Sequence, residues 1–209
     1  MALLMNKSWK IALAVAVLGL GLSGCVSDQA IGGPIAKVGF QHLPKIRLNV
    51  ANVLVKSNYK GLMEPPYAEQ RFPTPPERAL FDWALTRLVA VGGKEYAAVA
   101  QFEIDEASVI ETKLKKTEGF RAMLTYEPTA RYDATAVARL NIKNAENGAS
   151  GNIRVTAQRS IEVSENATLA QREEAWMVLV ENLMADFNTQ MELQINGYLS
   201  RWVDPQLLK

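Results

Sequence analysis

The sequence predicts an α+β fold, a two-layer sandwich in which two helices cover one face of a four-stranded, mainly antiparallel sheet in the order βαβββα. Four segments alternate apolar and polar residues with a period of two, which is typical of strands buried on one side. Two other segments space their apolar residues by three and four, as helices with one buried face do. Because each strand has a polar side, we expect both helices on the opposite face of the sheet.

The first strand is expected after residue 45. Its apolar residues on one face are Ile46, Leu48 and Val50. The apolar set then changes phase and continues at Val53 and Val55. A β-bulge near residues 51–52 would absorb this change of phase.

The loop that follows, residues 61–73, is rich in proline but unusually apolar for a loop. Its large apolar residues are Leu62, Met63, Tyr67 and Phe72. Two interpretations remain open for them. They either cap the core of the domain or form an exposed lip that contacts a partner or lipid.

A helix is predicted from residue 74 to residue 92. Thr74 can cap it together with Glu77, Pro75 suits the first turn, and Gly92 ends it. The expected buried face consists of Phe81, Ala84, Leu85, Leu88 and Val91. Trp83 falls outside that face.

Three strands and a hairpin are expected next. The inward-facing residues predicted for these strands are Ala98, Ala100, Phe102 and Ile104, then Tyr132, Ala134, Ala136, Ala138, Leu140 and Ile142, and finally Ile153, Val155 and Ala157. Turn-forming residues at 145–151 would join the last two strands as a hairpin. Residues 116–129 form either a projecting strand extension or a flexible loop.

The last predicted element is a helix from Thr168 to about Val203, in which Thr168 and Gln171 form a capping box. Its buried stripe is predicted to be Trp176, Val180, Leu183, Phe187, Met191, Ile195 and Leu199. Such a helix is roughly 50 Å long, which we expect to exceed a strand of the sheet. Either Gly197 kinks it, or its end overhangs. Tyr198 and Trp202 would then form an exposed contact surface, unless they fold back onto the core.

The amino-terminal residues are typical of a secretion signal. Lys7 and Lys10 precede an uncharged apolar run of about eleven residues, which is shorter than the roughly 20 needed to span a bilayer. The run ends in "LSGC", residues 22–25, which resembles the lipobox of bacterial lipoproteins. The resemblance implies cleavage before Cys25, a diacylglyceryl group on its thiol and a further acyl chain such as palmitate on its amine. The alternatives are an ordinary signal peptide with a chance cysteine, or a buried structural thiol.

This interpretation divides the chain into a signal peptide (1–24), a lipidated cysteine with a flexible tether (25–44), one α+β domain (45–204) and a short tail (205–209). Acyl chains on Cys25 would hold the protein on a membrane. The residue after the cysteine is Val26, not the aspartate that would resemble an inner-membrane retention signal. We therefore expect the protein on the outer membrane, facing the periplasm.

Composition argues against several functions. The 209 residues carry 23 basic and 22 acidic side chains, which gives no case for binding nucleic acid. The one histidine, His42, and one cysteine cannot build the common zinc sites. No nucleophile motif accompanies His42, and the glycine-rich stretches are too short to hold phosphates. We therefore predict no catalytic residue, metal or cofactor, and no enzyme.

The element order resembles two families, the lipopolysaccharide-assembly lipoproteins and the auxiliary lipoproteins of envelope ABC lipid-transport systems. This resemblance implies an accessory or scaffold subunit of a transport or assembly machine, with an envelope protein as partner and lipid or glycolipid as a further ligand. The alternatives are a regulatory lipoprotein that binds a cell-wall enzyme, and a periplasmic hydrolase. The candidate contact residues are Tyr198 and Trp202, with Arg139, Arg154 and Arg159 on the polar side of the sheet.

Overall fold

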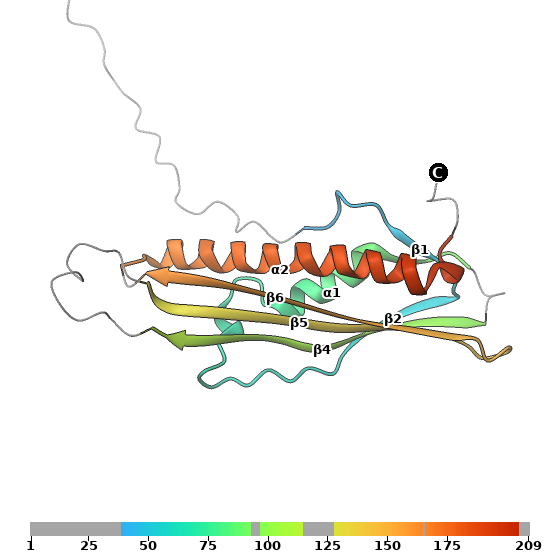
Figure 1. Cartoon of the computed structure of the whole chain (residues 1–209), viewed down its shortest axis with the longest axis horizontal. Helices are drawn as coiled ribbons and strands as arrows, with labels where there is room; N and C mark the ends of the chain where they lie inside the picture. Colours follow the sequence, from blue (N-terminus) through green and yellow to red (C-terminus); the bar gives the residue numbers. More distant parts are fainter. Residues whose placement is uncertain (1–38, 93–96, 115–127, 165, 205–209) are drawn as a thin grey trace, which may run out of the picture. The chain divides into compact units, whose positions relative to one another are not determined.

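The computed structural model describes residues 39–92, 97–114, 128–164 and 166–204. In this part of the chain, two helices lie side by side on the same face of a four-stranded sheet (Figure 1). Helix α1 (Pro76–Arg87) packs over β2 (Asn52–Ser57) and β4 (Ala98–Lys113), and helix α2 (Leu169–Tyr198) packs over β6 (Ser150–Ser164). The predicted α+β sandwich is therefore confirmed.

The four strands of the main sheet lie in the order β2 (Asn52–Ser57), β4 (Ala98–Lys113), β5 (Pro128–Asn144) and β6 (Ser150–Ser164). The β4–β5 and β5–β6 pairs are antiparallel, but β2 and β4 are parallel. The sheet is thus mixed, which corrects the expectation of a mainly antiparallel sheet. The parallel pair follows from the chain path, because α1 carries the chain back to the end of the sheet where β2 began.

The inward-facing residues predicted for β4, β5 and β6 are all buried, and the hairpin between β5 and β6 is confirmed. The register places Phe102 opposite Leu140 and Leu140 opposite Ile153, so one apolar row crosses three strands. The small side chains of Ala136 and Ala138 are fully buried beneath the helices.

The phase change near residues 51–52 has a different cause from the one predicted. Residues Ile46–Leu48 form β1, which pairs in parallel with β3 (Leu88–Ala90) in a separate two-stranded sheet. The chain then leaves that sheet and enters the main one as β2. A period-two pattern reports which side of a strand is buried, not the sheet to which the strand belongs. The main sheet has a bulge elsewhere, in β4 between Ile104 and Glu106.

Helix α1 differs from the prediction at both ends and in its buried face. Pro75 occupies the N-cap position without a side-chain hydrogen bond, so the predicted cap by Thr74 is wrong. The helix ends at Arg87 because the next residues join β3. Trp83 is fully buried, whereas Leu85 is 63% exposed. The predicted face included residues 88 and 91, which lie beyond the end of the helix. It was therefore rotated relative to the face that is buried.

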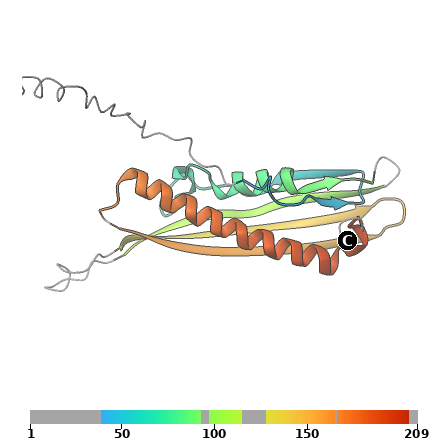
Figure 2. The same ribbon diagram turned by 90° about the horizontal axis from the view of Figure 1, so that it is seen from above.

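Helix α2 agrees with the prediction in its start and its buried stripe, but it ends at Tyr198 and not near Val203. The capping box of Thr168 and Gln171 is present, and all seven residues of the predicted stripe are buried. The helix runs along the sheet (Figure 2) and includes Gly197 before it ends at Tyr198. Its 30 residues span about 45 Å. The strands were expected to be shorter than the helix, but β4, β5 and β6 have 15 to 17 residues and match it in length.

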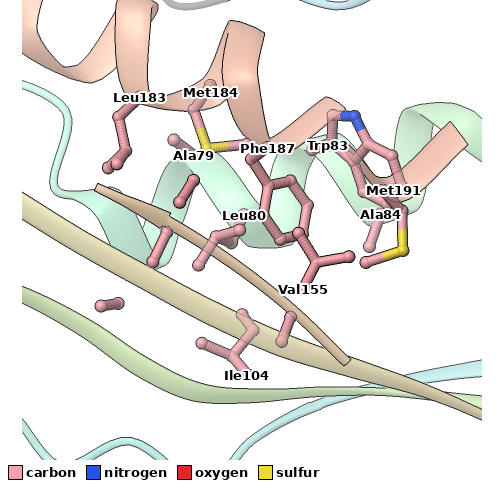
Figure 3. Packing of buried hydrophobic residues seen from close by; sticks show 14 of the residues in the cluster. Ala79, Leu80, Trp83, Ala84, Ile104, Val155, Leu183, Met184, Phe187 and Met191 are labelled. Atoms are coloured by element: carbon pink, nitrogen blue, oxygen red, sulfur yellow. The ribbon is translucent and has the colours of Figure 1, made fainter. Parts of the chain in front are cut away.

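The core lies between the helices and the sheet, where side chains from α1 and α2 meet (Figure 3). The Trp83 and Phe187 rings pack edge to face with centroids 5.2 Å apart, and the Trp83 indole donates a hydrogen bond of 2.9 Å to Asn188. Trp83 therefore packs against both the sheet and α2. This double contact explains why it is buried although it lies outside the predicted apolar face.

The apolar loop at residues 61–73 divides between the two predicted roles. Phe72 is buried, whereas Leu62 and Met63 are exposed. The backbone of Pro66 and Ala68 also bonds to β4 beyond the end of β2. Here the Ala68 N–H donates to Val109 at 2.9 Å, and the Glu111 N–H donates to Pro66 at 2.8 Å. The loop thus continues the edge of the sheet past β2.

Packing begins before the predicted domain boundary at residue 45, because Phe40 is buried and Leu43 packs on the core. Cys25, the predicted signal peptide, the tail at 205–209 and residues 116–127 of the expected strand extension or loop lie outside the described residues. Neither described helix has the length and apolar composition required to cross a bilayer.

Candidate functional site

The outer face of the sheet, opposite the helices, carries a network of ion pairs that crosses all four strands. We call it the outer-face network; its members are Lys56 of β2, Glu103 and Asp105 of β4, Arg139 of β5 and Arg154 of β6. Two of the predicted contact residues, Arg139 and Arg154, are thus brought together.

The register of the hairpin creates the need for this network. Arg139 and Arg154 lie directly opposite each other on neighbouring strands, and like charges in such a pair repel. The Asp105 carboxylate contacts both. It accepts two hydrogen bonds of 2.7 Å from Arg139 and one of 2.8 Å from Arg154. One carboxylate therefore holds two opposed arginines in place.

The bulge in β4 determines where Asp105 lies. In a regular strand, successive side chains alternate between faces, so Ile104 facing the core would be followed by a single outward position. The register shift between Ile104 and Glu106 makes Asp105 the extra residue of the strand. Bulges of this kind redirect a side chain, and here Asp105 meets the arginines of the next two strands.

Glu103 extends the network to the edge strand. Its carboxylate lies 3.0 Å from Nη2 of Arg139 and 2.7 Å from Nζ of Lys56. The Glu103 and Asp105 side chains are only 10% and 14% exposed, whereas those of Arg139 and Arg154 are 40% and 57% exposed. The surface offered to a partner is therefore cationic, with the carboxylates underneath.

The electrostatics of Asp105 agree with a fixed anion. Burial alone would raise the pKa of this carboxyl, but hydrogen bonds from Arg139 and Asn58 and the charges of both arginines outweigh burial and lower it. The hydrogen bond to Asp105 likewise raises the pKa of Arg139. Asp105 thus stays ionised, and both of its oxygens already accept hydrogen bonds from arginines. It is therefore better suited to positioning the arginines than to accepting a proton.

Arg159 was expected on the outer face of the sheet, but the structure places it on the helix side. It has the same parity in β6 as the buried Val155 and Ala157, so it points to the helix side. There it forms a two-pronged ion pair with Asp186 of α2, at 2.6 and 2.7 Å, and the hydrogen bond from this pair raises the pKa of Arg159. Arg159 therefore fastens the helix to the edge of the sheet.

Tyr198 and Trp202 have opposite environments. Tyr198, at the end of α2, is 72% exposed, whereas Trp202, in a 3₁₀ turn at Ser200–Trp202, is 7% exposed. The Trp202 ring packs over Gly151, where a Cβ atom would lie 2.5 Å from it. Trp202 therefore folds back onto the core and closes the end of the β5–β6 hairpin, and only Tyr198 is available to a partner.

The acidic members of the outer-face network, Glu103 and Asp105, are not among the contact residues expected from the sequence. Alternation places Glu103 on the polar side of its strand but does not show that either acid bonds to an arginine. The hairpin turn at residues 145–151 was the available signal, because it sets Arg139 opposite Arg154 and so requires an acid nearby. The bulge that supplies this acid also shifts the apolar pattern, which runs through Phe102 and Ile104 and then continues at Ala107 and Val109.

Two grooves lie in the helix layer. The larger, of about 380 Å³, is lined by Phe40, His42 and Leu43 and by Met184 and Asn188 of α2. The smaller, of about 260 Å³, borders the buried Arg87, which pairs with Glu192 of α2. Burial lowers the pKa of Arg87 although Glu192 opposes this effect. Within residues 39–92, 97–114, 128–164 and 166–204, no cluster of His, Cys, Asp and Glu could hold a metal ion.

No protein family model and no curated protein matches the chain. Among solved structures, it is similar to a Xanthomonas campestris protein of the DUF330 family, with 8% identity over 73% of this chain and 85% of that one and a TM-score of 0.34. It is also similar to the PelC dodecamer from Paraburkholderia phytofirmans, with 12% identity over 68% and 89% of the two chains and a TM-score of 0.21. At these values the similarity carries no argument about function.

Proposed function

We propose that this chain is a non-enzymatic lipoprotein of the bacterial envelope that serves as an accessory subunit of a transport or assembly machine. The observation that carries this proposal is the sequence around Cys25. A basic start, an apolar run too short to span a membrane and the residues "LSGC" occur together, and the chain contains no other cysteine.

Acylation of Cys25 would place the protein on a membrane surface. Two or three acyl chains hold a protein far more firmly than one chain does, so the α+β domain would stay near the bilayer without crossing it. With Val26 after the cysteine, we assign the protein to the outer membrane, with its domain in the periplasm.

The outer-face network supports a role in binding. Arg139 and Arg154 are both hydrogen-bonded to Asp105, and their side chains are still 40% and 57% exposed. Guanidinium groups suit carboxylates or phosphates, to which they bond with two N–H groups at once. A partner protein with acidic side chains, or a lipid or glycolipid with phosphate groups, would match this surface.

A photo-crosslinking amino acid at Lys143 tests the proposal, because Lys143 is exposed on the outer face of β5. The matched control is Leu85, which is exposed on α1 in the opposite layer. In living bacteria, we expect position 143 but not position 85 to capture a component of an envelope transport or assembly machine.

Other outcomes would contradict this function. Capture of a cell-wall synthesis enzyme at position 143 would favour the regulatory alternative. If neither position captured a protein and the purified chain hydrolysed a cell-wall or lipid substrate, the protein would be a periplasmic hydrolase.

A further inference from the structure

The two edges of the main sheet are treated differently. On one side, β2 is only six residues long, and the backbone of Pro66 and Ala68 covers β4 beyond it. On the other side, β6 has 15 residues, and among the described residues no strand or loop pairs with its outer edge. Free N–H and C=O groups along such an edge are a template for another strand.

The register shows which backbone groups of β6 are free. The Asn144 N–H donates to the Ala149 carbonyl at 2.8 Å, so these two residues form a hydrogen-bonded pair. In an antiparallel ladder, such pairs alternate with non-bonded ones. The odd-numbered residues of β6 therefore bond to β5, and the even-numbered residues from 150 to 162 direct their N–H and C=O groups outward.

The side chains of this edge are complementary to themselves. If two copies of β6 pair antiparallel with Gln158 opposite Gln158, the even-numbered positions bond to one another, as the free groups require. Arg154 then lies opposite Glu162 on the outer face. Both side chains are exposed, and Glu162 has no ion-pair partner in the described part of the chain. Opposite charges in such a pair are favourable.

The same register also matches the helix side of the strand. Val155 lies opposite Ile161, and Ile153 lies opposite Val163. These are pairs of β-branched residues, which pack well across neighbouring strands. Had Arg154 been placed opposite itself, the two strands would repel. One register therefore satisfies the backbone, the charges and the apolar side chains together.

We propose that β6 is the interface for a second copy of this chain, which joins two four-stranded sheets into one eight-stranded sheet about a twofold axis at Gln158. Helix α2 supports this arrangement. Asp186 marks the side of α2 that borders the edge, because it bonds to Arg159. Leu193, two turns later on that side, is 68% exposed. In the paired sheet, it would face the α2 helix of the other copy.

Disulfide crosslinking of the full chain in bacterial membranes tests the register. In the proposed pair, the Cα atoms at position 158 are about 5.5 Å apart, within the range of about 4.4–6.8 Å for a disulfide. On mild oxidation, we expect a dimer from Gln158→Cys. We expect none from Thr156→Cys or Ser160→Cys alone, but a dimer when these two variants are produced together. The unsubstituted chain controls for crosslinking through Cys25.

Charge reversal tests the pairing of Arg154 with Glu162 in the Gln158→Cys chain. Arg154→Glu or Glu162→Arg alone sets like charges opposite each other at two symmetric places, and we expect each to lower the dimer yield about fivefold. The double variant should restore it. Loss of the Arg154–Asp105 contact cannot explain such a rescue, because the double variant also lacks that contact.

Three results would overturn the proposal: monomer at every position, equal crosslinking at every position, or a crosslink from position 158 to a different protein. These results are separate from a failure of the proposed function. Crosslinking at β6 reports only on the strand pairing, whereas the photo-crosslinker at position 143 lies on β5 and reports on the outer face.

Discussion

At the scale of single residues, Asp105 has the largest consequence for the surface. It lies at a bulge, its side chain is only 14% exposed, and it bonds to two arginines that the hairpin sets opposite each other. Removing it would leave the like charges of Arg139 and Arg154 facing each other without the carboxylate that both contact. The network is thus a stabilising feature of the sheet as well as a candidate binding surface.

Asp105→Asn should lower the free energy of unfolding by about 1.5–3 kcal/mol at pH 7, the range for hydrogen bonds to charged groups. The folded-state pKa of Asp105 is lowered, so its contribution is complete above the unfolded value of about 3.9. The contribution disappears as the pH falls through the folded value. Chemical denaturation of both chains should therefore show a difference at pH 7 that shrinks as the pH falls below about 4.

The matched control is Asp133→Asn, which removes an exposed carboxylate paired with Arg131 on the same strand face. Exposed ion pairs contribute less than about 1 kcal/mol. Equal losses in the two variants, or a loss at Asp105 that does not depend on pH, would contradict the role assigned to Asp105.

At the scale of elements, the sequence predicts strands and the long helix better than the short helix. The inner faces of β4, β5 and β6 follow from period-two alternation, and α2 follows from its capping box and seven-residue stripe. The stripe of α2 is reliable because many turns repeat it. Helix α1 has only 12 residues, so including two residues beyond its end was enough to rotate the predicted face.

Leucine-to-alanine substitutions on α1 test the corrected face. Leu80 is fully buried, whereas Leu85 is 63% exposed although the sequence placed it in the core. We expect Leu80→Ala to lower the free energy of unfolding by about 2–5 kcal/mol and Leu85→Ala to change it by less than about 0.5 kcal/mol. Denaturant titration measures both. The reverse order would restore the face predicted from sequence.

The sequence predicted which arginines are candidates for the site, but not how they are arranged. Parity alone would have placed Arg159 on the helix side, since it shares the parity of Val155. The switch of the chain between two sheets at residues 49–51 and the bulge at Asp105 both depend on pairing between distant strands. A change of phase in the apolar pattern marks both places in the sequence, but it does not show whether the chain bulges or changes sheets, which the structure does.

At the scale of the whole molecule, three structural features support a role in binding. One layer of helices closes the core, the outer face of the sheet presents arginines fixed by buried acids, and β6 leaves a long edge open. The proposed anchor at Cys25 gives these surfaces a location. A domain held at a membrane by its amino-terminal end can bind partners repeatedly at a high local concentration.

Mass spectrometry of the full chain produced in a bacterium tests the central claim most directly. We predict a mature chain that begins at Cys25, with a diacylglyceryl group on the sulfur and an acyl chain on the amine. Cys25→Ala should carry neither group, keep its first 24 residues and lose this anchor. An unsubstituted chain that retained those residues, or that carried a free thiol at Cys25, would contradict the account.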